Sequence, residues 1–145
     1  MLEKYLENHI KVLEQVGDWK ESIRIAAMDL LEKDYISQHY IESMIENVMV
    51  NGTYIIILPQ IAIPHSRPET GAFKTSMSLL KLNQPVLYPE DKEVSLIIVL
   101  AASDNESHLE LIALLSELLE NRELLNQLFK APTAEHIQEL INQVE

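Results

Sequence analysis

The spacing of apolar residues predicts helices in the first third of the chain. A short helix is expected near Leu2–Leu6. Between residues 19 and 31, apolar side chains recur at intervals of three and four, which places them on one helical face. Asp18 and Glu21 have the spacing of a capping box at the start of this segment. A second helix should begin near Ser37 and end at the Asn-Gly turn signal that follows it.

The helical period returns in the last third of the chain. From Ser107 onward, the apolar residues of the segment 111–119 share a face. Asn121 is suited to cap a following short helix, and Thr133 is suited to cap a last one. The stripe expected to be buried in the last helix consists of Ile137, Leu140, Ile141 and Val144.

Short apolar or β-branched runs between these helices predict strands. They lie at residues 54–58, 76–82 and 94–101, and Pro, Gly, Asn or Asp residues bound them. The segment 9–16 is ambiguous between helix and strand, and we interpret it as an edge strand. Residues 94–101 show almost no alternation of apolar and polar positions, which is typical of a central strand covered on both faces.

These elements together predict an α/β fold, with a mixed β-sheet of about five strands sandwiched between helices on both faces. No internal repeat, low-complexity tract or linker divides the chain. At 145 residues, 47% of them hydrophobic, the chain has the size of one compact domain spanning residues 1–145.

The composition argues against several classes of protein. The longest unbroken apolar run, Leu96–Ala102, is far shorter than the ~20 residues needed to cross a bilayer, and the first residues lack the apolar core of a secretory signal. There is no cysteine, so a covalent intermediate must use another nucleophile. A net charge of −12 disfavours nucleic-acid binding. We therefore expect a cytoplasmic protein that does not insert into a membrane.

A polar cluster follows an apolar run in the middle of the chain: Pro64, His65, Ser66, Arg67 and Pro68. The two prolines restrict the backbone, so a stiff segment presents the imidazole. A neutral imidazole is available near pH 7 because its ordinary pKa is ~6.5, and its unprotonated nitrogen can attack phosphorus. Arg67 and the Ser66 hydroxyl could support the equatorial phosphoryl oxygens. From spacing alone, the alternative is a turn histidine with a satisfied hydrogen bond.

A second histidine, His108, lies just after the expected central strand, in the first turn of a predicted helix. Sheets of α/β proteins build their sites at such positions. Asp104, Asn105 and Ser107 are capping residue types, and the free N–H groups of a helix start favour a phosphate. The alternative is an exposed histidine without function. The remaining histidines are interpreted as non-functional: His9, His39 and His136.

Several motifs, taken in order, carry a resemblance to a known family. The core is AIPHSRPE, from Ala62 to Glu69, where an apolar strand leads into a Pro-His pair. NGTYIIILPQIAIPH and SHLELIALLSELL extend the likeness over nearly the whole chain. The sequence thereby resembles the enzyme IIA components of the fructose/mannitol type in the sugar phosphotransferase system. The Arg-Pro-Glu at residues 67–69 is most similar to the ascorbate-specific branch.

The resemblance implies a phosphoryl relay. His65 matches the family's phosphorylated histidine, and His108 matches a second histidine close to it in space. The histidine phosphocarrier protein would phosphorylate His65, which would pass the group to a cysteine of enzyme IIB, with a membrane permease (enzyme IIC) as an indirect partner. No cofactor, metal or nucleotide is required. Fructose and mannitol members tend to carry Arg-Glu where this chain has Asn47-Val48, so Arg67 is expected to supply the positive charge.

Three other functions stay open at this point. A regulatory module of the same fold would control another protein through its phosphorylation state. A metal-dependent hydrolase using His65, His108 and a carboxylate such as Asp104 is disfavoured, because no H-x-x-x-H or H-x-H spacing is present. A non-catalytic interaction protein with incidental histidines is the third. The sequence leaves the transported substrate and the oligomeric state undetermined.

Overall fold

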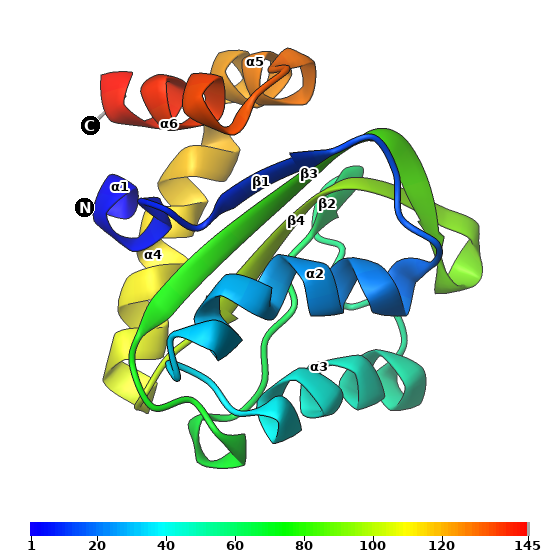
Figure 1. Ribbon diagram of the computed structural model, residues 1–145, viewed down its shortest axis with the longest axis vertical. Coiled ribbons are helices and arrows are strands. Elements are labelled where there is room, and N and C mark those ends of the chain that lie inside the picture. The colour runs from blue at the N-terminus through cyan, green and yellow to red at the C-terminus, as the bar shows by residue number, and fades with distance from the viewer. Residues whose placement is uncertain (145) are drawn as a thin grey trace.

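The computed structural model describes residues 1–144 and is built around one mixed sheet (Figure 1). Strands β1 (Ile10–Leu13), β2 (Gln60–Ala62), β3 (Ser76–Tyr88) and β4 (Lys92–Ala101) lie in the order β1-β3-β4-β2. The long β3–β4 hairpin is antiparallel, whereas each short edge strand runs parallel to its neighbour. The predicted mixed sheet is confirmed, but it has four strands where about five were expected.

The predicted strand at residues 54–58 is wrong. These residues form a turn and an irregular segment, and β2 begins later. The backbone N–H and the hydroxyl of Thr53 both donate to the Glu90 carboxylate, at 3.0 and 2.7 Å, which ties the segment to the tip of the β3–β4 hairpin. Ile55 is buried in the core, whereas Ile57 is 56% exposed. This tether and the packing of Ile55 therefore take the place of strand pairing.

Helices α2 (Trp19–Glu32) and α3 (Gln38–Asn51) cover one face of the sheet (Figure 1). Both follow the predicted bounds. Their apolar stripes pack on the same side of β3 and β4, where burial of aliphatic side chains supplies the main driving force for folding. The buried residues of the two helices are Ser22, Ile23, Ala26, Ala27, Leu30, Tyr40, Ile41, Met44, Ile45 and Val48.

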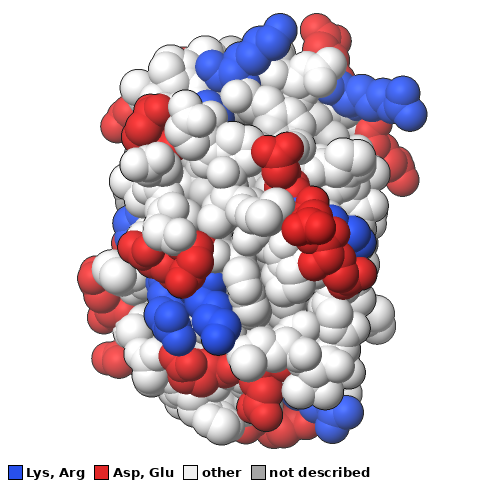
Figure 2. Space-filling model, turned by 90° about the vertical axis from the view of Figure 1, so that its right-hand side faces the viewer, with Lys and Arg blue, Asp and Glu red and all other residues white. Residues whose placement is uncertain are grey.

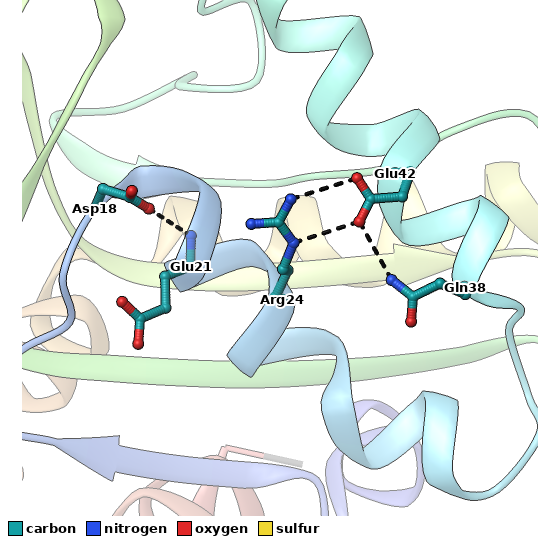
Figure 3. A network of polar contacts seen from close by, with 5 residues as sticks. All are labelled: Asp18, Glu21, Arg24, Gln38 and Glu42. Atoms are coloured by element: carbon teal, nitrogen blue, oxygen red, sulfur yellow. Dashed lines mark hydrogen bonds and ion pairs between the residues drawn. The ribbon is translucent and has the colours of Figure 1, made fainter.

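Polar contacts fix the start of α2 and link it to α3 (Figure 3). The Asp18 carboxylate accepts a hydrogen bond from the Glu21 N–H at 2.8 Å, as the capping-box pattern predicted. Further along α2, Arg24 donates to Glu42 on α3 at 3.3 Å, and Gln38 donates to the same carboxylate at 3.2 Å. These side chains are exposed, so the ion pair orients the helices while adding little stability.

The opposite face is covered by α1 (Leu2–Leu6), α4 (Asn105–Glu120), α5 (Arg122–Lys130) and α6 (Ala134–Gln143). The three predicted residues Ile137, Leu140 and Ile141 of α6 are buried. The fourth, Val144, is 52% exposed because it is the C-cap residue, beyond the last helical turn. Three of these helices begin at side-chain caps, which are Asp104, Asn121 and Thr133.

The surface carries most of the chain's net charge of −12. Figure 2 shows acidic side chains spread over one face of the molecule, with a compact basic cluster bordered by acidic groups. Among residues 1–144, none of the helices has the length and apolarity that crossing a bilayer requires.

Candidate functional site

The two histidines singled out in the sequence meet at one end of the sheet. His65 follows the end of β2, and His108 lies in the first turn of α4, just after β4. Because β2 and β4 are parallel neighbours, their carboxyl ends lie at the same edge. The two imidazole rings are 5.7 Å apart between centroids. Sequence positions far apart are therefore brought into one site.

The protonation of His65 is fixed by one hydrogen bond. Its Nδ1 lies 2.8 Å from the Ile63 carbonyl oxygen, which can only accept. Nδ1 therefore carries the proton, and Nε2 carries the free lone pair. Burial lowers the pKa of His65 below its ordinary value, and the neighbouring His108 acts in the same direction. The side chain thus stays neutral near pH 7, with one nucleophilic nitrogen.

A cavity of about 330 Å³ opens beside His65. Tyr54 forms one wall, with its ring at 87° to the imidazole and 5.8 Å between centroids. Among the described residues that line the cavity, Arg67 is the one cation and there is no carboxylate. In a chain with twice as many acids as bases, this site is therefore suited to an anion. Its lining residues are Asn47, Asn51, Tyr54, His65, Ser66, Arg67, Pro68, Asn105 and His108.

The start of α4 brings His108 and Asn105 to the cavity. The Asp104 side chain accepts a hydrogen bond from the Ser107 N–H at 2.7 Å and caps the helix. The hydrogen bonds from Ser107 lower the pKa of Asp104, so the cap is ionised at neutral pH. The first helical N–H groups have no intrahelical partners, and the helix dipole places partial positive charge here. Both features favour a phosphoryl group near His108.

The Ser66 hydroxyl is a hub that ties the His65 loop to α3. It lies 2.6 Å from the Ser43 hydroxyl, and it accepts hydrogen bonds from Thr70 at 3.1 Å and from Asn47 at 3.4 Å. These partners hold the hydroxyl among themselves. These contacts fit a role of Ser66 in positioning the loop that carries His65. Asn47 is part of this hub.

The Tyr40 hydroxyl also holds the His65 loop, and sequence reasoning missed it. It donates to the Leu100 carbonyl oxygen at 2.7 Å and accepts from the Ser66 N–H at 3.1 Å. It thereby joins α3, the end of β4 and the residue after His65. Burial raises the pKa of Tyr40 to about 12, so the phenol keeps its proton. The one available signal was a tyrosine on a buried helical stripe, whose hydroxyl must find a partner.

The last of the side chains predicted for the site, Arg67, is exposed and lines the cavity. Within residues 1–144 its guanidinium makes no ion pair with a carboxylate. A planar guanidinium free of carboxylates can bind two oxygens of a phosphoryl group. No cluster of three or more His, Asp or Glu side chains suited to a metal ion occurs among residues 1–144, so the hydrolase alternative gains no geometric support.

Comparison with known proteins places this chain in a class of phosphotransferase components. The sequence model of the family described as "Phosphoenolpyruvate-dependent sugar phosphotransferase system, EIIA 2" matches residues 4–144. The chain belongs to this family, as its motifs predicted.

Relatives from two sugar systems support the assignment. The mannitol-specific cryptic phosphotransferase enzyme IIA component of Escherichia coli K12 is 42% identical over 137 residues, covering 94% of this chain and 93% of the relative. The ascorbate-specific PTS system EIIA component of Salmonella typhimurium is 31% identical over 138 residues, covering 93% and 90%. Ascorbate-specific members are thus among the relatives, but of these two the mannitol-specific cryptic component is the more similar, whereas the Arg-Pro-Glu motif had favoured the ascorbate branch.

Solved structures confirm the fold. The solution structure of the mannitol-specific cryptic enzyme IIA from Escherichia coli matches with a TM-score of 0.93 at 41% identity, over 98% of each chain. Mannitol enzyme IIA from Escherichia coli, in its complex with phosphorylated enzyme IIB, matches with a TM-score of 0.80 at 23% identity, over 94% of this chain and 96% of that one. At that identity the second match shows the fold alone.

Proposed function

We propose that this chain accepts a phosphoryl group on Nε2 of His65 from the histidine phosphocarrier protein and passes it to a cysteine of an enzyme IIB component. A permease, enzyme IIC, would be the indirect partner that moves the sugar. The observation that carries the proposal is the hydrogen bond from Nδ1–H to the Ile63 carbonyl, which leaves Nε2 free beside a cavity lined without carboxylates. We place the relay in the cytoplasm and treat residues 1–145 as one domain.

The transfer balances without a proton donor or cofactor. The Nε2 lone pair attacks phosphorus as the N–P bond of the donor phosphohistidine breaks, and the donor imidazole keeps those electrons. The proton on Nδ1 stays in its bond to Ile63. In the second transfer a thiolate of enzyme IIB attacks the same phosphorus, and the bond to Nε2 breaks. Each step exchanges one P–N bond for a P–N or P–S bond.

Three groups would stabilise the charge that develops on the phosphoryl oxygens. Arg67 offers a paired set of N–H donors at the rim, which suits the bidentate geometry of phosphate. Asn105, the first residue of α4, lines the same cavity, so its side chain and the free N–H groups of the helix start would be the second and third. Since Asn47 is engaged with Ser66, Arg67 is the residue that we assign to replace the arginine that fructose and mannitol members tend to carry.

The substrate is proposed from the relatives. Their names indicate mannitol or ascorbate. In a relay of this kind the sugar contacts the permease and the phosphorylated enzyme IIB. The sugar specificity is therefore determined by the enzyme IIB that accepts phosphate from His65. The ascorbate system remains our assignment on the Arg-Pro-Glu motif, and transfer to mannitol enzyme IIB is the competing result.

The test is transfer of labelled phosphate from phosphoenolpyruvate through enzyme I and the histidine phosphocarrier protein. We expect acid-labile label on the wild type, none on His65→Ala, and slower labelling of His108→Ala. His136→Ala is the matched control, because this histidine lies in the first turn of α6 away from the site. A wild-type chain that stays unlabelled would refute the relay. Labelling without onward transfer to either enzyme IIB would favour the regulatory alternative.

A further inference from the structure

A second cavity lies at the edge of the sheet where β1 and β3 begin. Strands β3 and β4 separate it from His65, which follows the end of β2. Its volume is about 280 Å³, close to the lower limit of roughly 300 Å³ for pockets that hold drug-sized ligands. Its walls come from α1, from the segment after α2 and from the start of β3, which lie together on the left of Figure 1. The lining residues used below are Lys4, His9, Tyr35, Lys74 and Thr75.

Positive charge gathers at this cavity in a strongly acidic chain. Lys74 Nζ lies 4.6 Å from the centroid of the Tyr35 ring, and Lys33 Nζ lies 6.0 Å from the same centroid. Lys4 lines the wall as well. Within residues 1–144 none of these three lysines makes an ion pair with a carboxylate, whereas Lys11 and Arg24 each do. Lys4 and Lys74 thus line the cavity, and Lys33 borders it through Tyr35 and His9, which are lining residues. The Met1 ammonium at the same cavity is paired with the Glu3 carboxylate.

Buried His9 holds Lys33 at the cavity without neutralising it. His9 Nδ1 lies 2.9 Å from the Tyr5 carbonyl oxygen and 3.0 Å from that of Met77, so it carries the ring proton. Its Nε2 lone pair therefore accepts from Lys33 Nζ at 2.9 Å. The His9 side chain is 6% exposed, and its uncharged Nε2 accepts the hydrogen bond from Lys33. The positive charge of Lys33 remains available to a ligand.

We infer that this cavity binds a small oxyanion of the phosphate class, distinct from the phosphoryl group on His65. The three lysines supply charge, and the Thr75 hydroxyl supplies a neutral hydrogen bond. Thr75 also accepts from the Ser103 N–H at 3.1 Å, immediately before the Asp104 cap of α4. An anion bound here would contact Thr75, whose hydroxyl is bonded to Ser103, the residue before the cap of the helix that carries His108.

The test uses inorganic phosphate as the probe and residue-resolved NMR of the full chain, with chloride at matched ionic strength as the reference. We expect saturable shifts at His9, Lys74 and Thr75. In the double variant Lys33→Gln/Lys74→Gln, binding at these residues should weaken about a hundredfold, because two charged hydrogen bonds are lost and each is worth about one order of magnitude in affinity. Both lysines are exposed, so the variant should keep the fold.

Lys20→Gln is the matched control, because Lys20 Nζ lies 5.8 Å from the Trp19 ring and also flanks an aromatic side chain. It should leave phosphate binding unchanged. The proposal is overturned if the shifts grow linearly without saturation, if Lys20→Gln weakens binding equally, or if phosphate moves only the resonances around His65. An arm with His65→Ala separates the two sites, since the shifts at Lys74 and Thr75 should persist when the phosphoryl acceptor is gone.

Discussion

The hydrogen bond between His65 Nδ1 and the Ile63 carbonyl decides which imidazole nitrogen is a nucleophile. Carbonyl oxygens only accept, so the tautomer follows from a backbone position that the flanking Pro64 helps to fix. The same geometry recurs at His9, which donates to backbone carbonyls and keeps Nε2 unprotonated. At both histidines the backbone, not a carboxylate, sets the tautomer.

The first prediction concerns pH. Because burial lowers the pKa of His65, an NMR titration should give a midpoint below the ordinary value of ~6.5. The rate of phosphoryl acceptance should be constant above pH ~6.5 and fall as Nε2 takes up a proton below it. The unfolded chain binds this proton more readily than the folded chain does. The contribution of His65 to the free energy of unfolding should therefore fall as the pH drops from ~6.5, the ordinary pKa, to the lower pKa of the folded protein, and should not change above ~6.5. A midpoint above 6.5 would contradict the assignment.

The second prediction concerns Tyr40. Tyr40→Phe removes the hydroxyl that bonds Leu100 and Ser66, leaving buried backbone groups without a partner. We expect a loss of about 1–3 kcal/mol in unfolding free energy. We also expect slower phosphorylation of His65, because the loop that carries it is released.

Tyr88→Phe is the matched control for this effect. The Tyr88 hydroxyl is buried and lies 2.8 Å from the Ser22 hydroxyl, at the end of β3 remote from the site. It should reduce stability similarly in urea unfolding, while the phosphorylation rate stays at the wild-type value. Equal slowing in the two variants would mean that Tyr40 acts through global stability and has no positioning role.

Single residues also mark where sequence reasoning succeeds and fails. His65 and His108 were singled out from local motifs, a Pro-His pair and a helix start, which need only neighbouring residues. The structure brings their rings to 5.7 Å, and their roles stay predictions. Tyr40 was missed because its acceptor, Leu100, lies 60 positions away in the chain. Such a partnership exists only once the helix has packed on the sheet.

Among the elements, α4 has the most direct link to the site. Its first turn carries Asn105 and His108 into the cavity, and the Asp104 side chain holds that turn through the Ser107 N–H. A helix start deprived of its cap frays within the first turn. The position of His108 therefore depends on a residue outside the cavity.

The third prediction tests this dependence. Asp104→Ala should lower stability and accelerate hydrogen exchange at the first amides of α4. Phosphorylation of His65 should slow, and Asp104→Asn should restore it because the amide oxygen can also cap. Thr133→Ala removes the equivalent cap of α6, where Thr133 accepts from the His136 N–H at 3.1 Å. A similar loss of phosphorylation rate in this control would contradict the local role of Asp104.

The elements differ in how far local patterns determine them. The starts of α2, α3, α5 and α6 were predicted because a capping side chain and the N–H it accepts from are three residues apart. The strand expected at residues 54–58 failed because an apolar run suits a packed irregular segment equally well. What decides between them is the bond from Thr53 to Glu90, 37 positions away.

At the scale of the whole molecule, a net charge of −12 contrasts with a cavity whose described lining residues include no carboxylate. Figure 2 shows acidic side chains spread over one face of the molecule. The negative potential of the acidic surface should attract basic partner proteins, whereas the cavity itself is suited to an anion. The topology makes this arrangement accessible, because the sheet order β1-β3-β4-β2 puts the ends of β2 and β4 at one rim of the molecule.

Arg67 is the one cationic side chain among the described residues that line the cavity, so the charge of the cavity rim depends on whether His65 is phosphorylated. When His65 is unmodified, a partner protein that docks at the cavity meets the positive charge of Arg67. A phosphoryl group adds between about −1.5 and −2 charges, so loading reverses the polarity of the rim. The phosphoryl donor would therefore meet a positive rim, and the phosphoryl acceptor would meet a negative one on the same protein. The transfer itself would thus change the affinity of this surface for each partner.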